Sequence, residues 1–202
     1  MHRADRRFAR RVLTGDARAT AAFADRFQRD LLNLFCWLTR DAELAQDLTQ
    51  DTLARCWESL YQYRGEAALR TWVHRIAFTC LAAHHRGATR EQRGRERLAQ
   101  AHIPQQTEHT GLELRLALVA ALDQLPECER HAVVLCKLQG FTLREASAML
   151  DVPVGTVAWQ TATAVKKLRD LLGDTPPGEA ASAQPEVTPD VSDGTQAVRT
   201  ER

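Results

Sequence analysis

The chain has 202 residues, of which 44% are hydrophobic and 26% charged, and its 27 lysines and arginines nearly balance 26 acidic residues to give a formal net charge of +1. This composition is ordinary for a soluble protein of one medium or two small domains. It does not exclude nucleic-acid binding, because only the contact surface must be basic. No run approaches the roughly 18 apolar residues that span a bilayer. In a secretory signal an apolar segment follows the charged N-terminus, and this sequence has no such segment. We therefore expect a cytoplasmic protein.

The cysteines and histidines do not predict a metal or redox site. The cysteines form no CxxC pair, are odd in number and mostly lie in apolar helical patterns, which favours buried, reduced thiols. They are Cys36, Cys56, Cys80, Cys128 and Cys136. The His84-His85 pair has no spaced cysteine or carboxylate partner and is typical of a solvated helix end. No phosphate-binding loop, nucleophile elbow or zinc spacing occurs. We expect no metal, no cofactor, no small-molecule substrate and no enzymatic activity.

Residues 16–86 predict a helical bundle. Proline and glycine are nearly absent from residues 16–64, and apolar residues recur there at helical spacing. The apolar positions of two helices are Leu31, Leu34, Phe35 and Leu38, followed by Leu44, Leu48, Leu53, Trp57 and Leu60. Gly65 interrupts the pattern, and a third helix follows from about Leu69. Trp72 is expected in its core because Ile76 lies four residues on. No alternating β-branched stretch competes, so we expect helices packed as a bundle.

Two other segments lack this periodicity. Residues 87–110 contain Gly87, Gly94 and Pro104 and few large apolar residues, which predicts a linker. Its arginines are diluted by acidic residues and indicate a solvated face. They are Arg90, Arg93, Arg95 and Arg97. Residues 173–202 are rich in proline, small polar and acidic residues, and predict a disordered tail.

Residues 111–172 predict a second helical domain that contains a helix-turn-helix. Pro126 is well placed in the first turn of one helix. Thr142 and Glu145 have the spacing of a capping box, which begins a short helix. The turn Asp151-Val152-Pro153 leads into a longer helix over residues 154–172. A short helix joined to a longer one by such a turn is typical of DNA-binding helix-turn-helix segments.

Two sets of motifs occur in order along the chain. The first is Asp47-Leu48-Thr49-Gln50-Asp51-Thr52-Leu53, then Trp57, Tyr63-Arg64-Gly65-Glu66 and Thr71-Trp72-Val73-His74-Arg75-Ile76-Ala77. The second is Leu122-Asp123-Gln124-Leu125-Pro126-Glu127, then Gly140-Phe141-Thr142, Val154-Gly155-Thr156-Val157 and Lys166-Lys167-Leu168-Arg169. Together they resemble regions 2 and 4 of the extracytoplasmic-function (ECF) subfamily of sigma-70 type RNA polymerase sigma factors. The resemblance implies an all-α protein with two small helical domains, residues 16–86 and 111–172, joined by a flexible linker over residues 87–110 and followed by a disordered tail over residues 173–202.

The resemblance implies two roles for region 2. One helix face would bind core RNA polymerase through Asp47, Gln50 and Asp51, with Trp57 packed beneath them. The loop after this helix and the next helix would open and read the promoter −10 element. The residues at those positions are Arg64, Gly65, Glu66, Arg70, Arg75 and Thr79. A melted strand needs a cationic track for its phosphates and a pocket for a splayed base, and Arg70 and Arg75 can supply the charge.

Region 4 would read the −35 element as duplex, with one helix in the major groove. The residues at its contact positions are Thr156, Ala158, Trp159, Gln160, Thr163, Lys166 and Lys167. The family pattern places Lys, Ser and Arg directly after Gly-Thr-Val, whereas this chain has Ala158, Trp159 and Gln160 and no positive charge before Lys166. Gln160 can read adenine, and Trp159 or Thr163 can touch thymine methyl groups. Alternatively, Trp159 anchors a protein interface.

The function implied is that of a sigma factor that binds core RNA polymerase and directs promoter-specific transcription initiation. Its partners would be core polymerase, promoter DNA and an anti-sigma factor. Two alternatives stay open: a degenerate sigma-like protein that binds an anti-sigma factor or another regulator without driving transcription, and an ordinary two-domain DNA-binding repressor or activator. The motif from Asp47 to Trp57 argues against the last, because a simple repressor needs no polymerase-binding face.

Overall fold

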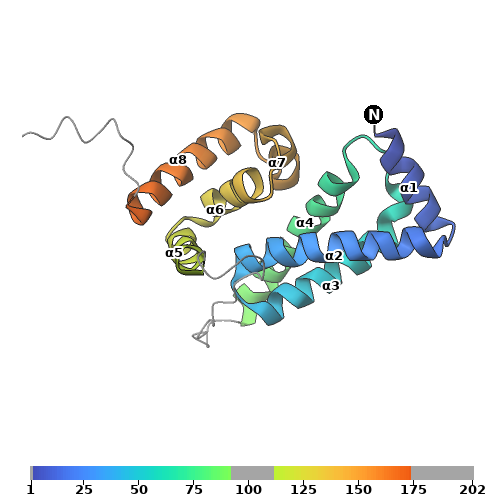
Figure 1. The fold of residues 1–202 in the computed structure, drawn as a ribbon, viewed down its shortest axis with the longest axis horizontal. Coiled ribbons are helices and arrows are strands. Elements are labelled where there is room, and N and C mark those ends of the chain that lie inside the picture. Colours follow the sequence, from blue (N-terminus) through green and yellow to red (C-terminus); the bar gives the residue numbers. More distant parts are fainter. Residues whose placement is uncertain (1, 92–111, 174–202) are drawn as a thin grey trace, which may run out of the picture.

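The computed structural model describes residues 2–91 and 112–173, and within these ranges every regular element is helical (Figure 1). The first group is α1 (Arg3–Leu13), α2 (Ala17–Thr39), α3 (Ala42–Ser59), the short 3₁₀ helix η1 (Leu60–Gln62) and α4 (Leu69–Glu91). The second is α5 (Leu112–Asp123), α6 (Glu127–Val133), the π-helical segment η3 (Val134–Leu138), α7 (Leu143–Leu150) and α8 (Val154–Leu172). The expected all-α class with two helical domains is confirmed. The predicted linker beyond Glu91 and the predicted tail beyond Gly173 lie outside the described residues.

Helix α2 carries the centre of the first group. Its apolar residues recur every three or four positions, so they form one continuous stripe along the helix. Phe23, Phe27, Leu31, Leu34 and Phe35 on this stripe have no exposed surface, and α3 and α4 pack against it. The apolar pattern that predicted this helix is therefore the buried one.

Side-chain caps determine where α2 and α3 begin. The Asp16 carboxylate accepts a hydrogen bond from the Ala19 backbone N–H at 3.0 Å, and Asp41 accepts one from the Glu43 backbone N–H at 3.1 Å. These bonds satisfy N–H groups that have no partner in the first turn of a helix. Arg40, between the two helices, has a left-handed φ of 57° and ends α2.

The first group extends beyond its predicted bounds at both ends. Helix α1 precedes the expected start at residue 16, and α4 continues to Glu91, past the expected end at residue 86. Only Ala9 and Val12 of α1 are fully buried, and Phe8 packs on Phe23 with ring centroids 6.5 Å apart. Its apolar residues Phe8, Ala9 and Val12 lie on one face of the helix, so the prediction missed α1 by starting the bundle at residue 16.

Helices α7 and α8 form the predicted helix-turn-helix. The Glu145 backbone N–H donates to the Thr142 hydroxyl at 3.3 Å, and the Thr142 backbone N–H donates to the Glu145 carboxylate at 2.9 Å, so the capping box is confirmed. Asp151 lies between the helices with a left-handed φ of 54°. Helix α8 spans Val154–Leu172, the range predicted from the sequence.

The two groups pack against each other, mainly through α4 and α7 (Figure 1). The contacts include aromatic rings in the middle and ion pairs toward the ends of α2 and α4. The pairs are Thr71 with Glu145, His74 with Phe141, Phe78 with His131, Arg40 with Asp123 and His85 with Glu127. The second helical group therefore contacts α4 from Thr71 in its first turn to His85 near its far end.

His74 lies at the centre of this contact and has no exposed surface. Its Nδ1–H donates to the Arg70 carbonyl at 2.9 Å, while its Nε2 is buried with no hydrogen-bond partner in the described part of the chain. Protonation would add a second N–H donor with nothing to accept it. Burial therefore lowers the pKa of His74 to about 4.

The cysteines follow the expected pattern in part. Cys36, Cys56 and Cys80 are buried, and burial raises the pKa of the Cys56 thiol to about 12. Cys136 is half-buried, and Cys128 is exposed. The expectation of burial is therefore wrong for Cys128, because this residue lies on the outward side of the first turn of α6. All five thiols are free.

The backbone at Asp151 gives a stability test. Because the residue is exposed and left-handed, Asp151→Val should lower the free energy of unfolding by about 1–2 kcal/mol, as β-branched side chains clash with their own backbone there. Asp151→Gly should leave it unchanged or higher, since glycine takes this conformation without strain. Urea denaturation measures both, and equal stability of the two variants would contradict the structure.

The burial of His74 gives a pH test. Its folded pKa of about 4 lies below the ordinary value of 6.5, so the unfolded state binds a proton that the folded state does not. Its stabilising contribution, about 3 kcal/mol, is present above pH 6.5 and is lost as the pH falls toward 4. Arg70 lowers the pKa of His74 further, and Asp30 opposes this.

We expect His74→Gln to flatten the decrease in stability between pH 6.5 and 5, as measured by denaturation at several pH values. Gln28→Ala, at an exposed position on α2 without a titratable group, is the control and should keep the wild-type slope. An unchanged slope in the His74 variant would show that this imidazole is not the group that titrates.

Candidate functional site

One face of α3 presents a row of polar side chains to solvent. Asp47, Gln50 and Asp51 are all exposed and lie within one turn of each other, while Leu48 and Thr52 between them are buried and fix the helix to the bundle. The predicted polymerase-binding residues thus form one continuous acidic and amide surface on a rigid helix.

Trp57 lies one and a half turns further along α3. We expected it beneath the polar row. Its ring centroid is 5.1 Å from that of Phe23, which anchors it to α2, yet 36% of the residue is exposed. Trp57 therefore borders the polar row as an apolar contact surface and is only partly packed beneath it.

A pocket of about 350 Å³ lies where the loop before α4 meets the first turns of that helix. Its lining residues are Gln62, Tyr63, Arg64, Gly65, Glu66, Ala67, Thr71, Trp72, Arg75 and Ala148. The Tyr63 hydroxyl donates to the Ala67 carbonyl at 2.7 Å, which closes the loop on itself. Burial raises the pKa of Tyr63 to about 12, so this donor keeps its proton at neutral pH. The loop is therefore held in one conformation around the pocket.

Most residues predicted to contact the −10 element lie around this pocket. Arg64, Glu66 and Arg75 are exposed at its rim, and Gly65 lies in its wall with a φ of +74°. Thr79 lies one turn beyond Arg75, and its hydroxyl donates to the Arg75 carbonyl at 3.0 Å. Trp72, expected in the core, packs against it and also lines the pocket.

Arg70 is the exception, because its guanidinium is bound within the protein. It donates to Asp30 at 3.0 Å, to the Gln139 carbonyl at 2.9 Å and to the Gln139 side chain at 3.0 Å, and it stacks over the Phe141 ring at 4.1 Å. In this arrangement it offers no free charge to a phosphate. No sequence pattern predicts this cluster, because Arg70 is 69 residues from Gln139.

The second helical group also takes part in the pocket. Ala148 of α7 lines it, and Thr71, which lines the pocket from α4, donates to Glu145 of α7 at 3.0 Å. The Thr142 backbone N–H, above all, holds the pKa of Glu145 below its ordinary value, so Glu145 is a charged acceptor at neutral pH. Helix α7 therefore narrows the approach to the pocket.

The predicted −35 residues divide between the two sides of α8. Trp159 is 64% exposed and Lys166 is exposed, and Thr156, Ala158 and Thr163 are partly exposed beside them. Gln160 is only 8% exposed because it lies on the inward face with Val157 and Ala164. Gln160 therefore faces the core of the second group and cannot read a base edge in this conformation.

Lys167 is held by an interaction within the protein. Its ammonium donates to the Glu129 carboxylate at 2.8 Å, and Glu129 is buried. A buried carboxylate needs a cation partner. Of the two neighbouring lysines, Lys166 is the exposed one. Trp159 is the most exposed large side chain on the outward face of α8.

The described residues hold neither a metal-ligand group nor a membrane span. No three of their histidine, cysteine and acidic side chains come together as a metal site. None of their helices has the length and apolarity to cross a membrane. The features of the candidate site are its polar helix face, its loop pocket and its helix-turn-helix.

Two known protein families match the chain in the order of its two helical groups. Residues 23–91 match Sigma-70 region 2, and residues 115–168 match Sigma-70, region 4. The first match ends with α4 and begins after α1, so α1 lies outside both. The second contains the helix-turn-helix.

The matches to curated relatives extend over most of the length of both proteins. The RNA polymerase sigma-H factor of Pseudomonas aeruginosa is 28% identical over 166 residues, which cover 76% of this chain and 86% of that protein. The ECF RNA polymerase sigma factor SigM of Mycobacterium tuberculosis is 31% identical over 170 residues, which cover 80% of this chain and 81% of that protein.

Solved structures share the fold. The sigma factor RpoE of Bartonella quintana, in complex with the anti-sigma factor NepR, superimposes with a TM-score of 0.67 at 22% identity, over 78% of this chain and 98% of that one. CnrH, in complex with the cytosolic domain of CnrY, gives a TM-score of 0.65 at 25% identity, over 85% and 99%. With both sigma-70 regions matched in order and a sigma factor 31% identical along most of its length, this chain belongs to the extracytoplasmic-function subfamily of sigma-70 type RNA polymerase sigma factors.

Proposed function

We propose that this chain is a sigma factor that binds core RNA polymerase through α3 and directs promoter-specific initiation through the loop pocket and α8. The observation that carries the proposal is the placement of an exposed polar helix face and a pocket of about 350 Å³ on one rigid bundle. Both lie in the region matched by Sigma-70 region 2. Such a protein would act in the cytoplasm, where polymerase and promoter DNA are found.

The face of α3 suits a partner with basic and polar side chains. Asp47 and Asp51 supply charge, Gln50 supplies both donors and acceptors, and the exposed edge of Trp57 supplies apolar area. Aromatic residues beside charged ones are typical of strong interface contacts. We assign these four residues to core-polymerase binding.

The loop pocket suits one unstacked base of a melted strand. Its walls combine the Trp72 ring with polar groups of the loop, and Arg64 and Arg75 at its rim can hold flanking phosphates. Stacking on an aromatic ring together with nearby cations is how proteins bind single strands. We assign the pocket to the −10 element.

Region 4 must move away from α4 before a strand can enter. Ala148 and the Thr71–Glu145 bond stand at the pocket, and Arg70 is occupied by Gln139 and Phe141. We propose that the described arrangement is a closed form and that opening releases Arg70 for DNA. By analogy with the complex of RpoE with the anti-sigma factor NepR, an anti-sigma factor is the partner we expect to control this step.

On α8 we assign −35 contacts to the outward face alone. Trp159 and Thr163 would touch thymine methyl groups, Lys166 a phosphate, and Thr156 and Ala158 the groove edge. Gln160 and Lys167 are left out of this set, because one is buried and the other pairs with Glu129. This face is poor in charge, so the affinity of region 4 alone for DNA should be low.

The assignment of α3 is tested with the double variant Asp47→Ala, Gln50→Ala. We expect at least a tenfold weaker Kd for core polymerase, because two polar contacts are removed from a rigid face. Asp25→Ala, Gln28→Ala on α2 is the matched control, since it removes the same two residue types at the same spacing from another exposed surface. Equal Kd values for the two double variants would refute the assignment.

In vitro transcription with core polymerase and a library of promoter fragments tests the function as a whole. Productive initiation supports a working sigma factor. Core binding without initiation on any fragment would instead support a degenerate sigma-like regulator, which the charge-poor start of α8 favours. Absence of core binding by the wild-type chain would refute both.

Trp159 and Gln160, which are neighbours in α8, test whether its outward face contacts DNA. Trp159→Ala should weaken binding of the holoenzyme to promoter DNA and change the free energy of unfolding by less than about 0.5 kcal/mol, because the side chain is exposed. Gln160→Ala should do the reverse, lowering stability by about 1 kcal/mol through lost packing. The opposite result, with Gln160 controlling DNA affinity, would show that α8 is turned differently on DNA.

A further inference from the structure

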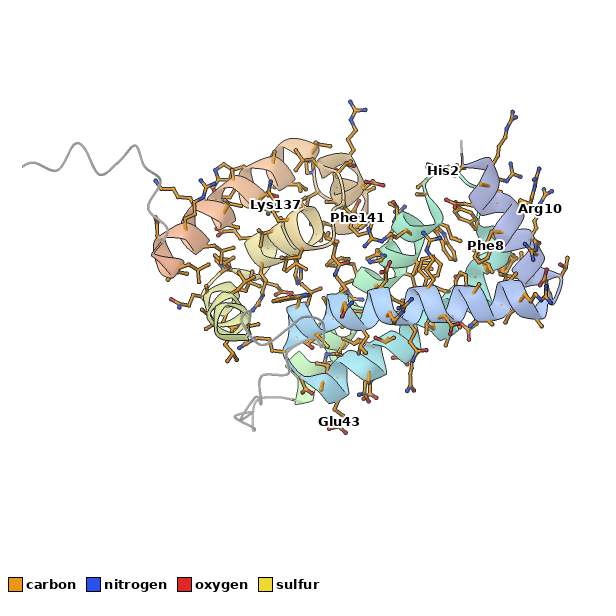
Figure 2. The ribbon with its side chains drawn as sticks, in the orientation of Figure 1. His2, Phe8, Arg10, Glu43, Lys137 and Phe141 are labelled. Carbon is orange, nitrogen blue, oxygen red and sulfur yellow. The ribbon has the colours of Figure 1, made fainter. Side chains whose placement is uncertain are left out.

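Helix α1 carries five arginines in 11 residues and lies outside both ranges matched by the family. Ala9 and Val12 face the bundle and are buried. Arg3, Arg7 and Arg10 recur at the spacing i, i+4 and i+7 on the opposite side, and all three are exposed. Figure 2 shows Arg10 pointing outward from α1, whereas Phe8 lies on its inner side. We call these three residues the arginine stripe.

The charges of the stripe are not neutralised by the protein. Arg11, next to the stripe, pairs with Asp16 at 2.8 Å. Within the described ranges, Arg3, Arg7 and Arg10 have no acidic partner. Like charges at this spacing repel each other, and Arg3 at the start of α1 also opposes the helix dipole, which Arg10 in the last turn does not. The stripe is thus unfavourable for α1 in isolation and would be stabilised by an external anion.

The helix is fixed to the loop that forms the proposed −10 pocket. The His2 backbone N–H donates to the Gly65 carbonyl at 3.1 Å, and the Asp5 carboxylate accepts the Leu69 backbone N–H at 2.9 Å, at the start of α4. The Arg6 side chain covers Gly65 so closely that a Cβ there would lie 2.4 Å from the Arg6 Cγ. Figure 1 shows this loop beside the N-terminal end of α1. The helix that carries the stripe is therefore attached directly to the loop that lines the pocket.

From this juxtaposition we infer that the arginine stripe binds the phosphodiester backbone of the promoter strand whose base enters the pocket. The three side chains cover about 10 Å of helix axis, and a nucleic-acid strand carries one phosphate per about 3.4 Å of its axis in a duplex. Guanidinium groups bind phosphate oxygens in pairs. The strand-binding surface thus extends from the matched region onto α1. This inference rests on the proposed function of the pocket.

The test uses the full chain assembled with core polymerase and a promoter fragment with an unpaired −10 bubble. Arg3→Gln, Arg7→Gln, Arg10→Gln should bind the fragment at least tenfold more weakly at low salt. The slope of log affinity against log salt should also be smaller by about 2, since each single-strand phosphate contact contributes about 0.7. Arg18→Gln, Arg26→Gln, Arg29→Gln on α2 removes the same charge from exposed positions and should keep the wild-type slope.

Each remaining outcome counts against the inference. An unchanged slope in the α1 variant, or an equal change in both triple variants, would show that the stripe makes no local phosphate contact. A loss of core-polymerase affinity without a change in DNA affinity would assign the stripe to the polymerase instead. Failure of the wild-type chain to bind core would remove the proposed function itself, which a separate core-binding assay detects. A wild-type chain that binds core and initiates, beside an unchanged α1 variant, removes only the inference.

Discussion

The packing of the two helical groups against each other depends on the contacts of the Arg70 guanidinium. It bonds to Asp30 of its own bundle and to the Gln139 carbonyl and side chain of the other, and it lies over the ring of Phe141. Charge-assisted hydrogen bonds in such a partly buried place are stronger than neutral ones. They hold α7 over the start of α4, which in turn places Ala148 at the loop pocket. The orientation of region 4 on region 2 is thus set by a few polar contacts around one cation.

The contacts around Arg70 occupy part of the surface that the proposed function needs for DNA. The residues that would hold a melted strand lie in the loop before α4 and on its first turns, and one of them, Arg70, is bound by the second helical group. Around Arg70, the buried His74 and the Thr71–Glu145 hydrogen bond add further contacts between the two groups. A partner that binds the open form must supply more free energy than these contacts lose. In the proposed mechanism, polymerase and DNA favour the open form, and an anti-sigma factor would favour the closed one.

The loop pocket, by contrast, is held independently of region 4. Tyr63 closes the loop on Ala67, and α1 fixes its other side through Asp5 and the backbone of Gly65. Moving region 4 away from α4 therefore leaves this loop intact and removes only the part of the pocket lining that Ala148 supplies. A preformed pocket binds an unstacked base without paying to order the loop first. The arginine stripe on α1 would extend the same preformed surface along the strand.

The sequence by itself determined the helices and their buried faces, because apolar spacing and caps are local properties of the chain. It predicted the bounds of α8, the capping box at Thr142 and the turn that begins at Asp151, and through family motifs it predicted both regions. Only the tertiary structure decided which polar residues are free. Gln160 is buried by the packing of α8, and Arg70 is occupied by partners distant in the chain, neither of which leaves a periodic signal. The apolar face of α1 is a local property as well, but its position beside the loop depends on bonds to residues about 60 positions away, such as Asp5 with Leu69, which leave no signal in the sequence.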